Sequence, residues 1–516
     1  MRTFIGLCSL LLLGASLRAD DAPPAPKNAE ADTAKTKDGK DADKPKDDKK
    51  ERKVESKHAI TLNGTKIDYT ATAGLIPLKD AEGKTTAEIF YIAYTKDGPV
   101  DAAKRPLTFS FNGGPGSSSV WMHLGLLGPK RVKLQDTGFA VPPPYELVDN
   151  ESCFLDETDL VFIDPVGTGF SRAVKPDDAH KFWGVKEDAN SVGEFIRLYV
   201  TRNTRWSSPK FLIGESYGTT RAAALSEVLS HQHRMSLNGI MLVSTVLNFQ
   251  TIWGGEGNDL PYVLYLPTFT ATAWYHKRLP ADLQALPLEA VLQQAEAFAS
   301  GEYNQALLLG NGLESAARAT IVKQLARFTG LAESLVDRAN LRISMSRFAA
   351  ELLRDQNLVL GRFDSRYTSF VRDPLSSGAE RDPSADAVFN AFGSTFNHYV
   401  RTELKFEEDI PYNLLGGVGP WNWGAENSFV NVAETLADSL AENPFLKVHV
   451  SCGRYDLATP YFASRYTFRH IGVPPSLAKN ITLADYTAGH MMYLNLPDLK
   501  KQKTDLTGFI RSASRP

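Results

Sequence analysis

Short runs of apolar residues recur along the chain, bounded by glycine, proline or polar residues. Uninterrupted runs of this kind are typical of strands that are buried on both faces of a parallel sheet. Amphipathic stretches over 220–230 and 431–441 predict helices that cover such a sheet. The pattern therefore predicts an α/β fold with a mostly parallel central sheet. Its strands are expected over residues 107–112, 160–163, 210–213, 239–243 and 446–451.

Two further segments, 58–69 and 88–95, precede these runs and resemble the strands of a hairpin. Residues 80–83 (DAEG) between them have turn chemistry. Order is expected to begin near His58, and residues 58–249 to form the first part of the core.

The pattern of apolar and polar residues changes between residues 250 and 425. Amphipathic stretches dominate there, and no clear strand pattern is visible. We interpret 250–425 as a helical cap inserted over the carboxyl edge of the sheet, where α/β folds carry their sites. An independent second domain is the alternative, but the βα pattern resumes afterwards, so 426–516 is predicted to complete the core. The expected helices are 288–298, 315–328, 331–342 and 344–353.

The N-terminal residues have the pattern of an export signal. Arg2 precedes an apolar segment, 4–17, which is too short to span a bilayer and is followed by Ala19. Residues 1–19 are therefore predicted to be a signal peptide, and the protein to be periplasmic or secreted without stable membrane insertion afterwards. An uncleaved membrane anchor is the alternative. Residues 20–57, rich in Asp, Lys, Ala and Pro, are expected to be a disordered tether.

Composition narrows the class of protein further. The chain has 516 residues, 57 basic and 60 acidic, and a formal net charge of −3. This balance gives no electrostatic reason to expect nucleic acid as a partner. With only 3 Cys, one of them in the predicted signal, a disulfide-rich miniprotein is excluded. Cys153 and Cys452 could form a bridge or stay buried thiols, and the sequence leaves both open.

The most informative motif is Gly214-Glu-Ser-Tyr-Gly218, a G-x-S-x-G pentapeptide between a predicted strand and a predicted helix. In that context the serine lies on a sharp turn, and small neighbours leave its hydroxyl exposed. Gly214 and Gly218 would let the two backbones approach. The motif predicts that Ser216 is a nucleophile.

A serine nucleophile needs a base, and the base needs an orienting acid. Asp456 follows the last predicted strand, and His490 lies in a Gly-containing loop further on. The order Ser, acid, His is that of α/β-hydrolases. Asp485 is the second candidate for the acid, while His398 and His470 remain candidates for the base.

Three motifs together resemble the serine carboxypeptidases, peptidase family S10. They are the segments 112–119 (NGGPGSSS), 164–171 (DPVGTGFS) and 214–218 (GESYG). The resemblance spans roughly residues 60–500 and matches the insertion only in its placement. It implies an α/β-hydrolase fold, with no metal and no cofactor.

The resemblance also implies roles for residues of this chain. Ser216 would be the nucleophile, His490 the general base and acid, and Asp456 the orienting acid. The backbone N–H groups of Gly114 and Tyr217 would form the oxyanion hole.

The substrate implied by the family is a peptide with a free C-terminus. Asn112 and Glu215 would bind its terminal carboxylate, or else they brace the glycine loop by hydrogen bonds. A protonated Glu215 could donate a hydrogen bond to that carboxylate, whereas an ionised one would repel it. We therefore expect better peptidase activity in acid than above neutral pH.

Two positions depart from the family pattern. Leu126 stands where the family has a second glutamate, and Ser117 stands where it has a cysteine. The first departure keeps an esterase or acyltransferase open, and a non-catalytic binding protein is the third hypothesis. The pocket walls are expected from the insertion and from aromatic residues, although aromatic residues in loops more often serve packing than substrate contact: Trp121, Tyr217, Trp421 and Trp423.

Overall fold

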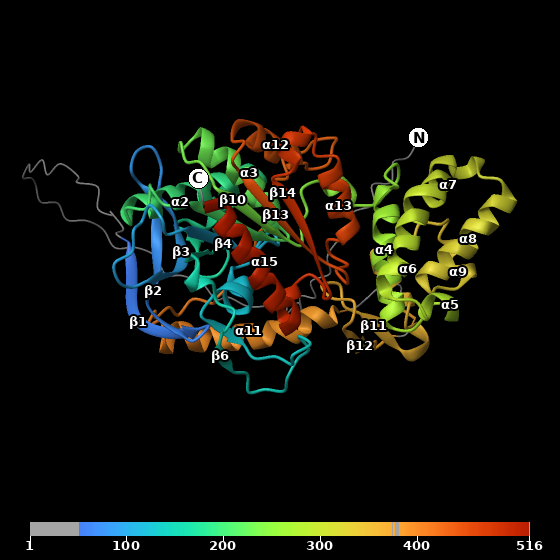
Figure 1. Ribbon diagram of the computed structural model, residues 1–516, viewed down its shortest axis with the longest axis horizontal. Helices are drawn as coiled ribbons and strands as arrows, with labels where there is room; N and C mark the ends of the chain where they lie inside the picture. Colours follow the sequence, from blue (N-terminus) through green and yellow to red (C-terminus); the bar gives the residue numbers. More distant parts are fainter. Residues whose placement is uncertain (1–50, 374, 377–380, 515–516) are drawn as a thin grey trace, which may run out of the picture. The chain divides into compact units, whose positions relative to one another are not determined.

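A ten-stranded sheet is the centre of the fold in the computed structural model (Figure 1). The structure describes residues 51–373, 375–376 and 381–514, which fall within one compact unit, Asp47–Pro516. The predicted signal peptide, 1–19, and most of the predicted tether lie outside the described residues.

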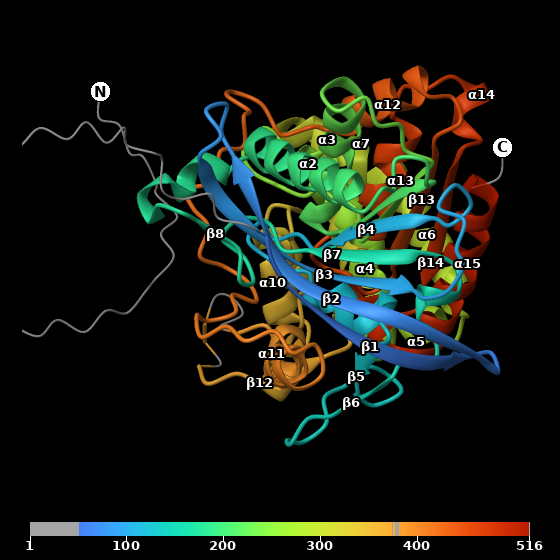
Figure 2. The same ribbon diagram turned by 90° about the vertical axis from the view of Figure 1, so that its left-hand side faces the viewer.

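The sheet is mixed and mostly parallel. Its order is β1-β2-β3-β7-β4-β9-β10-β13-β14, with β8 paired to β3. Strands β7, β4, β9, β10, β13 and β14 are parallel to one another, whereas β1, β2 and β3 form an antiparallel extension at one end (Figure 2). The strands of this sheet are β1 (Arg52–Leu62), β2 (Thr65–Lys79), β3 (Thr85–Lys96), β4 (Leu107–Phe111), β7 (Asp159–Ile163), β8 (Arg172–Ala173), β9 (Lys210–Glu215), β10 (Gly239–Val243), β13 (Lys447–Gly453) and β14 (Ile481–Tyr486).

The N-terminal extension differs from the prediction in two ways. β1 begins at Arg52, so the predicted tether, 20–57, extends six residues too far and order begins before His58. The predicted strand 58–69 is two strands, because Asn63 and Gly64, both at positive φ, turn the chain between β1 and β2. An Asn-Gly pair is a favoured two-residue hairpin turn, so the chain carries a signal for this break.

Alternate residues of the central strands enter two different apolar layers. In β9, Leu212 packs with helices α2 and α3 on one face, while Phe211 and Ile213 pack with α15 and α11 on the other. This alternation is the reason why the strands read as unbroken apolar runs. The helices that flank the sheet are α1 (Val120–Met122), α2 (Val185–Arg202), α3 (Tyr217–His231), α12 (Ala433–Glu442), α13 (Tyr461–Arg469), α14 (Pro475–Ala478) and α15 (Leu496–Ser514).

The region between β10 and α12 is mostly helical, as predicted. Its helices α4 to α9 gather beside the sheet (Figure 1). The last one, α11, instead adds its apolar residues to the layer that contains α15. The region also holds a two-stranded sheet, β11 (Leu358–Leu360) with β12 (Thr368–Phe370), which the sequence did not predict. The helices are α4 (Leu260–Tyr275), α5 (Ala281–Gln284), α6 (Leu288–Phe298), α7 (Asn304–Leu309), α8 (Ser315–Thr329), α9 (Glu333–Arg338), α10 (Met345–Glu351) and α11 (Pro383–Thr402).

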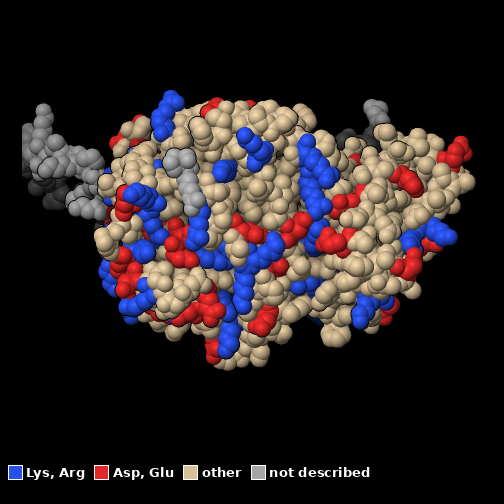
Figure 3. Space-filling view, in the orientation of Figure 1, with Lys and Arg blue, Asp and Glu red and all other residues tan. Residues whose placement is uncertain are grey.

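Three observations bear on the sequence analysis. Cys153 and Cys452 are both buried free thiols, so no bridge joins them. No helix in the described part of the chain is long and apolar enough to cross a membrane. On the face shown in Figure 3, acidic and basic side chains are interspersed.

Candidate active site

Ser216 lies at the turn between β9 and α3. Its backbone has φ 60° and ψ −129°, a left-handed conformation that is strained for any residue except glycine. The backbones around it are in close contact. A Cβ atom on Gly214 would lie 2.1 Å from the carbonyl oxygen of Gly218, and one on Gly218 would lie 2.8 Å from that of Phe111. Only glycine fits at these two positions, which agrees with the reading of the motif.

His490 and Asp456 meet at the carboxyl edge of the sheet. His490 Nδ1 lies 2.7 Å from Asp456 Oδ2, and both side chains are buried. The carboxylate also accepts hydrogen bonds from the N–H groups of Ala458 (2.7 Å) and Thr459 (2.9 Å) and from the Thr459 hydroxyl (2.6 Å). Burial alone would lower the pKa of His490. The charge of Asp456, the hydrogen bond to Asp456 and the charge of Glu215 together outweigh this effect, so the pKa of His490 lies above its usual value.

The other candidates for acid and base have different partners. Asp485 binds Arg454 (3.2 Å) and Arg465 (2.6 Å). The same two arginines pair with acidic residues of α6, Arg454 with Glu289 (2.9 Å) and Arg465 with Glu296 (2.8 Å). Asp485 thus helps to fasten the insertion to the core. His398 lies on the exposed side of α11, and the ring of His470 stacks on that of Tyr466.

One pocket of about 260 Å³ has Ser216 and His490 in its wall. Asn112 and Glu215 line the same pocket, with Asn112 Nδ2 donating to Glu215 Oε1 at 2.8 Å. The Tyr493 hydroxyl also faces this pair. Burial raises the pKa of Glu215 to about 7, against the opposing effects of His490, Tyr493 and Asn112. Tyr493, three residues after His490, was not predicted as a site residue from the sequence.

The glycine loop after β4 lies against the start of α3. Gly114 has φ 101° and lines the pocket, and a Cβ atom on Gly113 would lie 2.4 Å from the backbone nitrogen of Tyr217. The N–H of Tyr217 is the first in α3 and has no partner within that helix. Gly114 thus lines the same pocket as Ser216, and the Tyr217 N–H belongs to the residue that follows Ser216.

The 164–171 motif supports this glycine loop from behind. Asp164 is buried, and its Oδ1 accepts a hydrogen bond from the N–H of Ser119 at 2.8 Å. A Cβ atom on Gly169 would lie 1.7 Å from Asp164 Oδ2, so glycine is required there. Burial raises the pKa of Asp164 to about 7.

The aromatic residues expected around the pocket divide into two groups. Trp121 lines it and donates from Nε1 to Ser117 Oγ at 2.9 Å. The Tyr217 side chain is buried and packs edge-on against Trp421 and Trp423, and none of these three side chains lines the pocket. Leu126 is buried in the π-helix His123–Leu127 and is likewise absent from the wall.

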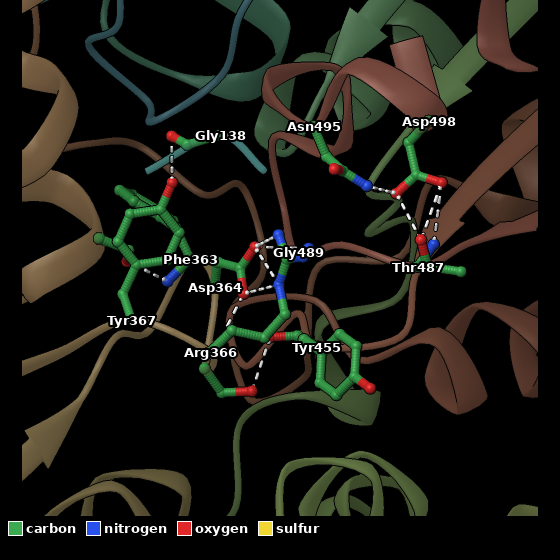
Figure 4. A network of polar contacts seen from close by, with 12 residues as sticks. Gly138, Phe363, Asp364, Arg366, Tyr367, Tyr455, Thr487, Gly489, Asn495 and Asp498 are labelled. Carbon is green, nitrogen blue, oxygen red and sulfur yellow. Dashed lines mark hydrogen bonds and ion pairs between the residues drawn. The ribbon is translucent and has the colours of Figure 1, made fainter. Parts of the chain in front are cut away.

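A segment of the insertion, 362–367, braces the loop that carries His490 and the loop that carries Asp456 (Figure 4). The Phe363 carbonyl accepts from the N–H of His490 (2.5 Å), and the two rings stack at 5.2 Å. Asp364 Oδ2 accepts from the N–H of Gly489 (2.9 Å), while Arg366 binds Asp364 through Nε and Nη2. In the loop that carries Asp456, the N–H of Leu457 donates a hydrogen bond to the Arg362 carbonyl (3.0 Å). No motif in the sequence indicates this brace.

The described residues contain no group of three or more His, Cys, Asp or Glu side chains that could hold a metal ion. The chemistry available at the site is that of a hydroxyl, an imidazole, a buried carboxylate and two backbone donors. Such a set suits acyl transfer.

Comparisons with known proteins agree with this arrangement. The family model "Peptidase_S10: Serine carboxypeptidase" matches residues 63–490. Serine carboxypeptidase-like 35 of Arabidopsis thaliana is 28% identical over 226 residues, which cover 40% of this chain and 45% of that protein. The pheromone-processing carboxypeptidase KEX1 of Saccharomyces cerevisiae is 31% identical over 179 residues, covering 32% and 23%. The matches thus span less than half the length of these curated relatives.

A solved structure supports the fold independently. The crystal structure of a prohormone-processing carboxypeptidase from Saccharomyces cerevisiae, KEX1(Δ)p, superposes with a TM-score of 0.52 at 17% identity, over 86% of this chain and 90% of that one. At this identity the likeness concerns the fold alone. Because the family model covers most of the described residues, motifs included, the chain belongs to the serine carboxypeptidase family and has the α/β-hydrolase fold.

Proposed function

We propose that the protein is a serine carboxypeptidase that releases C-terminal residues from peptides through an acyl-enzyme. The observation that carries the proposal is one pocket lined by Ser216, His490 and the pair Asn112–Glu215. It combines a nucleophile and base with groups that can hold a carboxylate.

The reaction follows from the roles of these groups. His490, oriented by Asp456 through Nδ1, takes the Ser216 proton as the hydroxyl attacks the last peptide carbonyl. The N–H groups of Gly114 and Tyr217 bind the oxygen that becomes negative. His490 then protonates the leaving amine, and the C-terminal residue departs. Water, activated by the same imidazole, hydrolyses the ester on Ser216 and restores the enzyme.

Recognition of the chain end is assigned to Asn112 and Glu215. A neutral Glu215 can donate one hydrogen bond to the substrate carboxylate, and a pKa of about 7 keeps it neutral in acid. Asn112 orients Glu215 through the 2.8 Å bond to Oε1. These two side chains, rather than the triad, would make the enzyme an exopeptidase.

The test compares matched peptides that differ only at the C-terminus. Peptides with a free carboxylate should release amino acids, while their C-terminally amidated forms should react at least about tenfold more slowly, because an amide cannot take up the Glu215 hydrogen bond in the same way. Chromatography of released amino acids measures both. Equal rates on the two forms would contradict the exopeptidase assignment. A fluorophosphonate probe that labels Ser216 would show the nucleophile independently of the substrate.

An esterase or acyltransferase is the second candidate, favoured by Leu126. Leu126 is a buried apolar residue at the position where the family has a second glutamate. Recognition of the substrate carboxylate therefore rests on Asn112 and Glu215 without a second glutamate. Rapid turnover of small p-nitrophenyl esters without any release of amino acids from peptides would favour this candidate.

The brace from the insertion yields a prediction about positioning. Replacing Asp364 by alanine removes the acceptor for the Gly489 N–H and leaves the Arg366 guanidinium without its carboxylate. We expect kcat to fall about tenfold with little change in KM, since a lost buried hydrogen bond displaces the loop that carries His490. Steady-state kinetics measure kcat and KM separately and so show which of the two constants changes.

Asp364→Asn is the matched control, because its side-chain oxygen can still accept the Gly489 hydrogen bond. It should recover most of the lost kcat. An alanine variant that loses thermal stability but keeps the wild-type kcat would show that the brace supports only the fold.

A further inference from the structure

The pocket wall contains one permanent cation, Arg362, among its described lining residues. Its guanidinium lies 5.6 Å from the centre of the Phe363 ring, and that ring stacks on His490 at 5.2 Å. The positive charge is close enough to His490 to lower its pKa slightly against the effect of Asp456. Arg362 therefore places a positive charge beside the reacting groups.

The backbone of Arg362 is fixed by hydrogen bonds, whereas its guanidinium lies over the Phe363 ring and is otherwise exposed. Its N–H donates to Asp382 Oδ1 (3.0 Å) and its carbonyl accepts from the N–H of Leu457 (3.0 Å). Within the described ranges, no carboxylate forms an ion pair with the guanidinium, and the side chain is exposed. Arg366, four residues on, differs because Asp364 neutralises it. An exposed guanidinium on an anchored backbone at a pocket mouth is suited to binding a ligand.

The remaining walls define what such a ligand can be. Trp121, Val388, Phe389, Leu415 and Met491 supply an apolar surface. The acidic residue in the wall is Glu215, which is assigned to the terminal carboxylate and is neutral below about pH 7. A second carboxylate on the substrate would then meet Arg362 without a competing anion. Guanidinium and carboxylate match in geometry as well as in charge.

We propose that Arg362 is a specificity-determining residue that selects peptides with an acidic side chain next to the scissile bond. This inference rests on the proposed carboxypeptidase function and adds its substrate class. The acidic side chain can belong to the last or to the penultimate residue, and the two positions share the same chemistry.

The experiment uses the full chain and N-blocked dipeptides at pH 6, where aspartate and glutamate side chains are ionised. One pair, Glu-Leu and Gln-Leu, varies the penultimate residue, and the other, Leu-Glu and Leu-Gln, varies the last one. In at least one pair the acidic peptide should have a kcat/KM about tenfold higher than its amide partner, as expected for a charge-assisted hydrogen bond. The pair that shows the difference identifies the position.

Variants test whether Arg362 is the cause. Arg362→Gln should abolish the preference, measured as the ratio of kcat/KM between each acidic peptide and its amide partner, and Arg362→Glu should favour Lys over Gln at the same position. Arg338→Gln, an exposed arginine of α9 outside the pocket wall, is the matched control and should keep the preference. Because the guanidinium is exposed, the preference should shrink as salt is added.

The outcomes separate this inference from the proposed function. Release of amino acids from all four dipeptides at equal rates would overturn the role of Arg362 and leave the carboxypeptidase standing. A preference that persists in Arg362→Gln would also overturn it. If no dipeptide is cleaved while esters are hydrolysed, the proposed function itself fails.

Discussion

Replacing Ser216 by alanine is expected to lower kcat on peptides by a factor of about 10⁴–10⁶, because the acyl-enzyme can no longer form. His490→Ala should cost about as much, and the double variant little more, since the two groups act as one unit. Release of free amino acids, followed over hours, measures the residual rate. An alanine variant with more than about one hundredth of the wild-type kcat would contradict the role of Ser216.

The backbone at Ser216 provides a check that the loss is chemical. A residue held at φ 60° and ψ −129° stores strain on the order of 1–3 kcal/mol, which glycine does not. Ser216→Gly should therefore be as inactive as Ser216→Ala but more stable to thermal unfolding. Ser300→Ala, at an exposed position of the π-helix Ala299–Tyr303 in the insertion, is the control for the serine-to-alanine change and should keep full activity.

The second large effect is expected from pH. Burial raises the pKa of Glu215 to about 7, and only its neutral form can donate to a substrate carboxylate. For each unit of pH above 7, kcat/KM on a peptide with a free C-terminus should fall about tenfold relative to an uncharged ester, reaching about a hundredfold at pH 9. The ratio is informative because the titration of His490 affects both substrates and cancels.

Glu215→Gln should make this ratio independent of pH, since an amide does not titrate in that range. A ratio that still falls in the Gln variant would assign the pH dependence to another group, and a flat ratio in the wild type would remove Glu215 from carboxylate recognition.

The same pKa has a consequence for stability. In the unfolded chain Glu215 loses its proton near pH 4.5, but in the folded protein it does so near 7. Between these values the folded state holds one more proton, so the free energy of unfolding falls as pH rises, by on the order of 3 kcal/mol in total. Glu215→Gln should lose this contribution in denaturant titrations.

Much of the fold could be predicted because the central strands are buried on both faces. β10 was predicted at its observed bounds, and α6 likewise, since their apolar patterns end at clear breaks. β14 was missed because it lies at the end of the sheet, where only Tyr486 of its six residues is buried and Thr482 and Asp485 interrupt the apolar run. β11 and β12, three residues each, are too short to have a pattern.

The site divides in a similar way. Ser216, Asp456 and His490 could be named as candidates from local motifs and chain order, because a tight turn and a glycine loop have recognisable sequence patterns. The brace over 362–367 could not, since Asp364 meets Gly489 only through the path of the insertion. The Tyr217 side chain was expected in the pocket wall but is buried, because a helix that begins at this residue directs it into the α2–α3 layer.

The ion pairs between α6 and the core bear on how a substrate reaches Ser216. Glu289 and Glu296 bind Arg454 and Arg465, which flank the loop that holds Asp456, and the 362–367 segment binds the same loop from its other end. An insertion fastened at both places cannot swing aside like a lid without disturbing the acid and the imidazole. We therefore expect the insertion to stay in place during turnover, so that the proposed peptidase would trim loose polypeptide tails and leave chain ends that are packed into a folded protein.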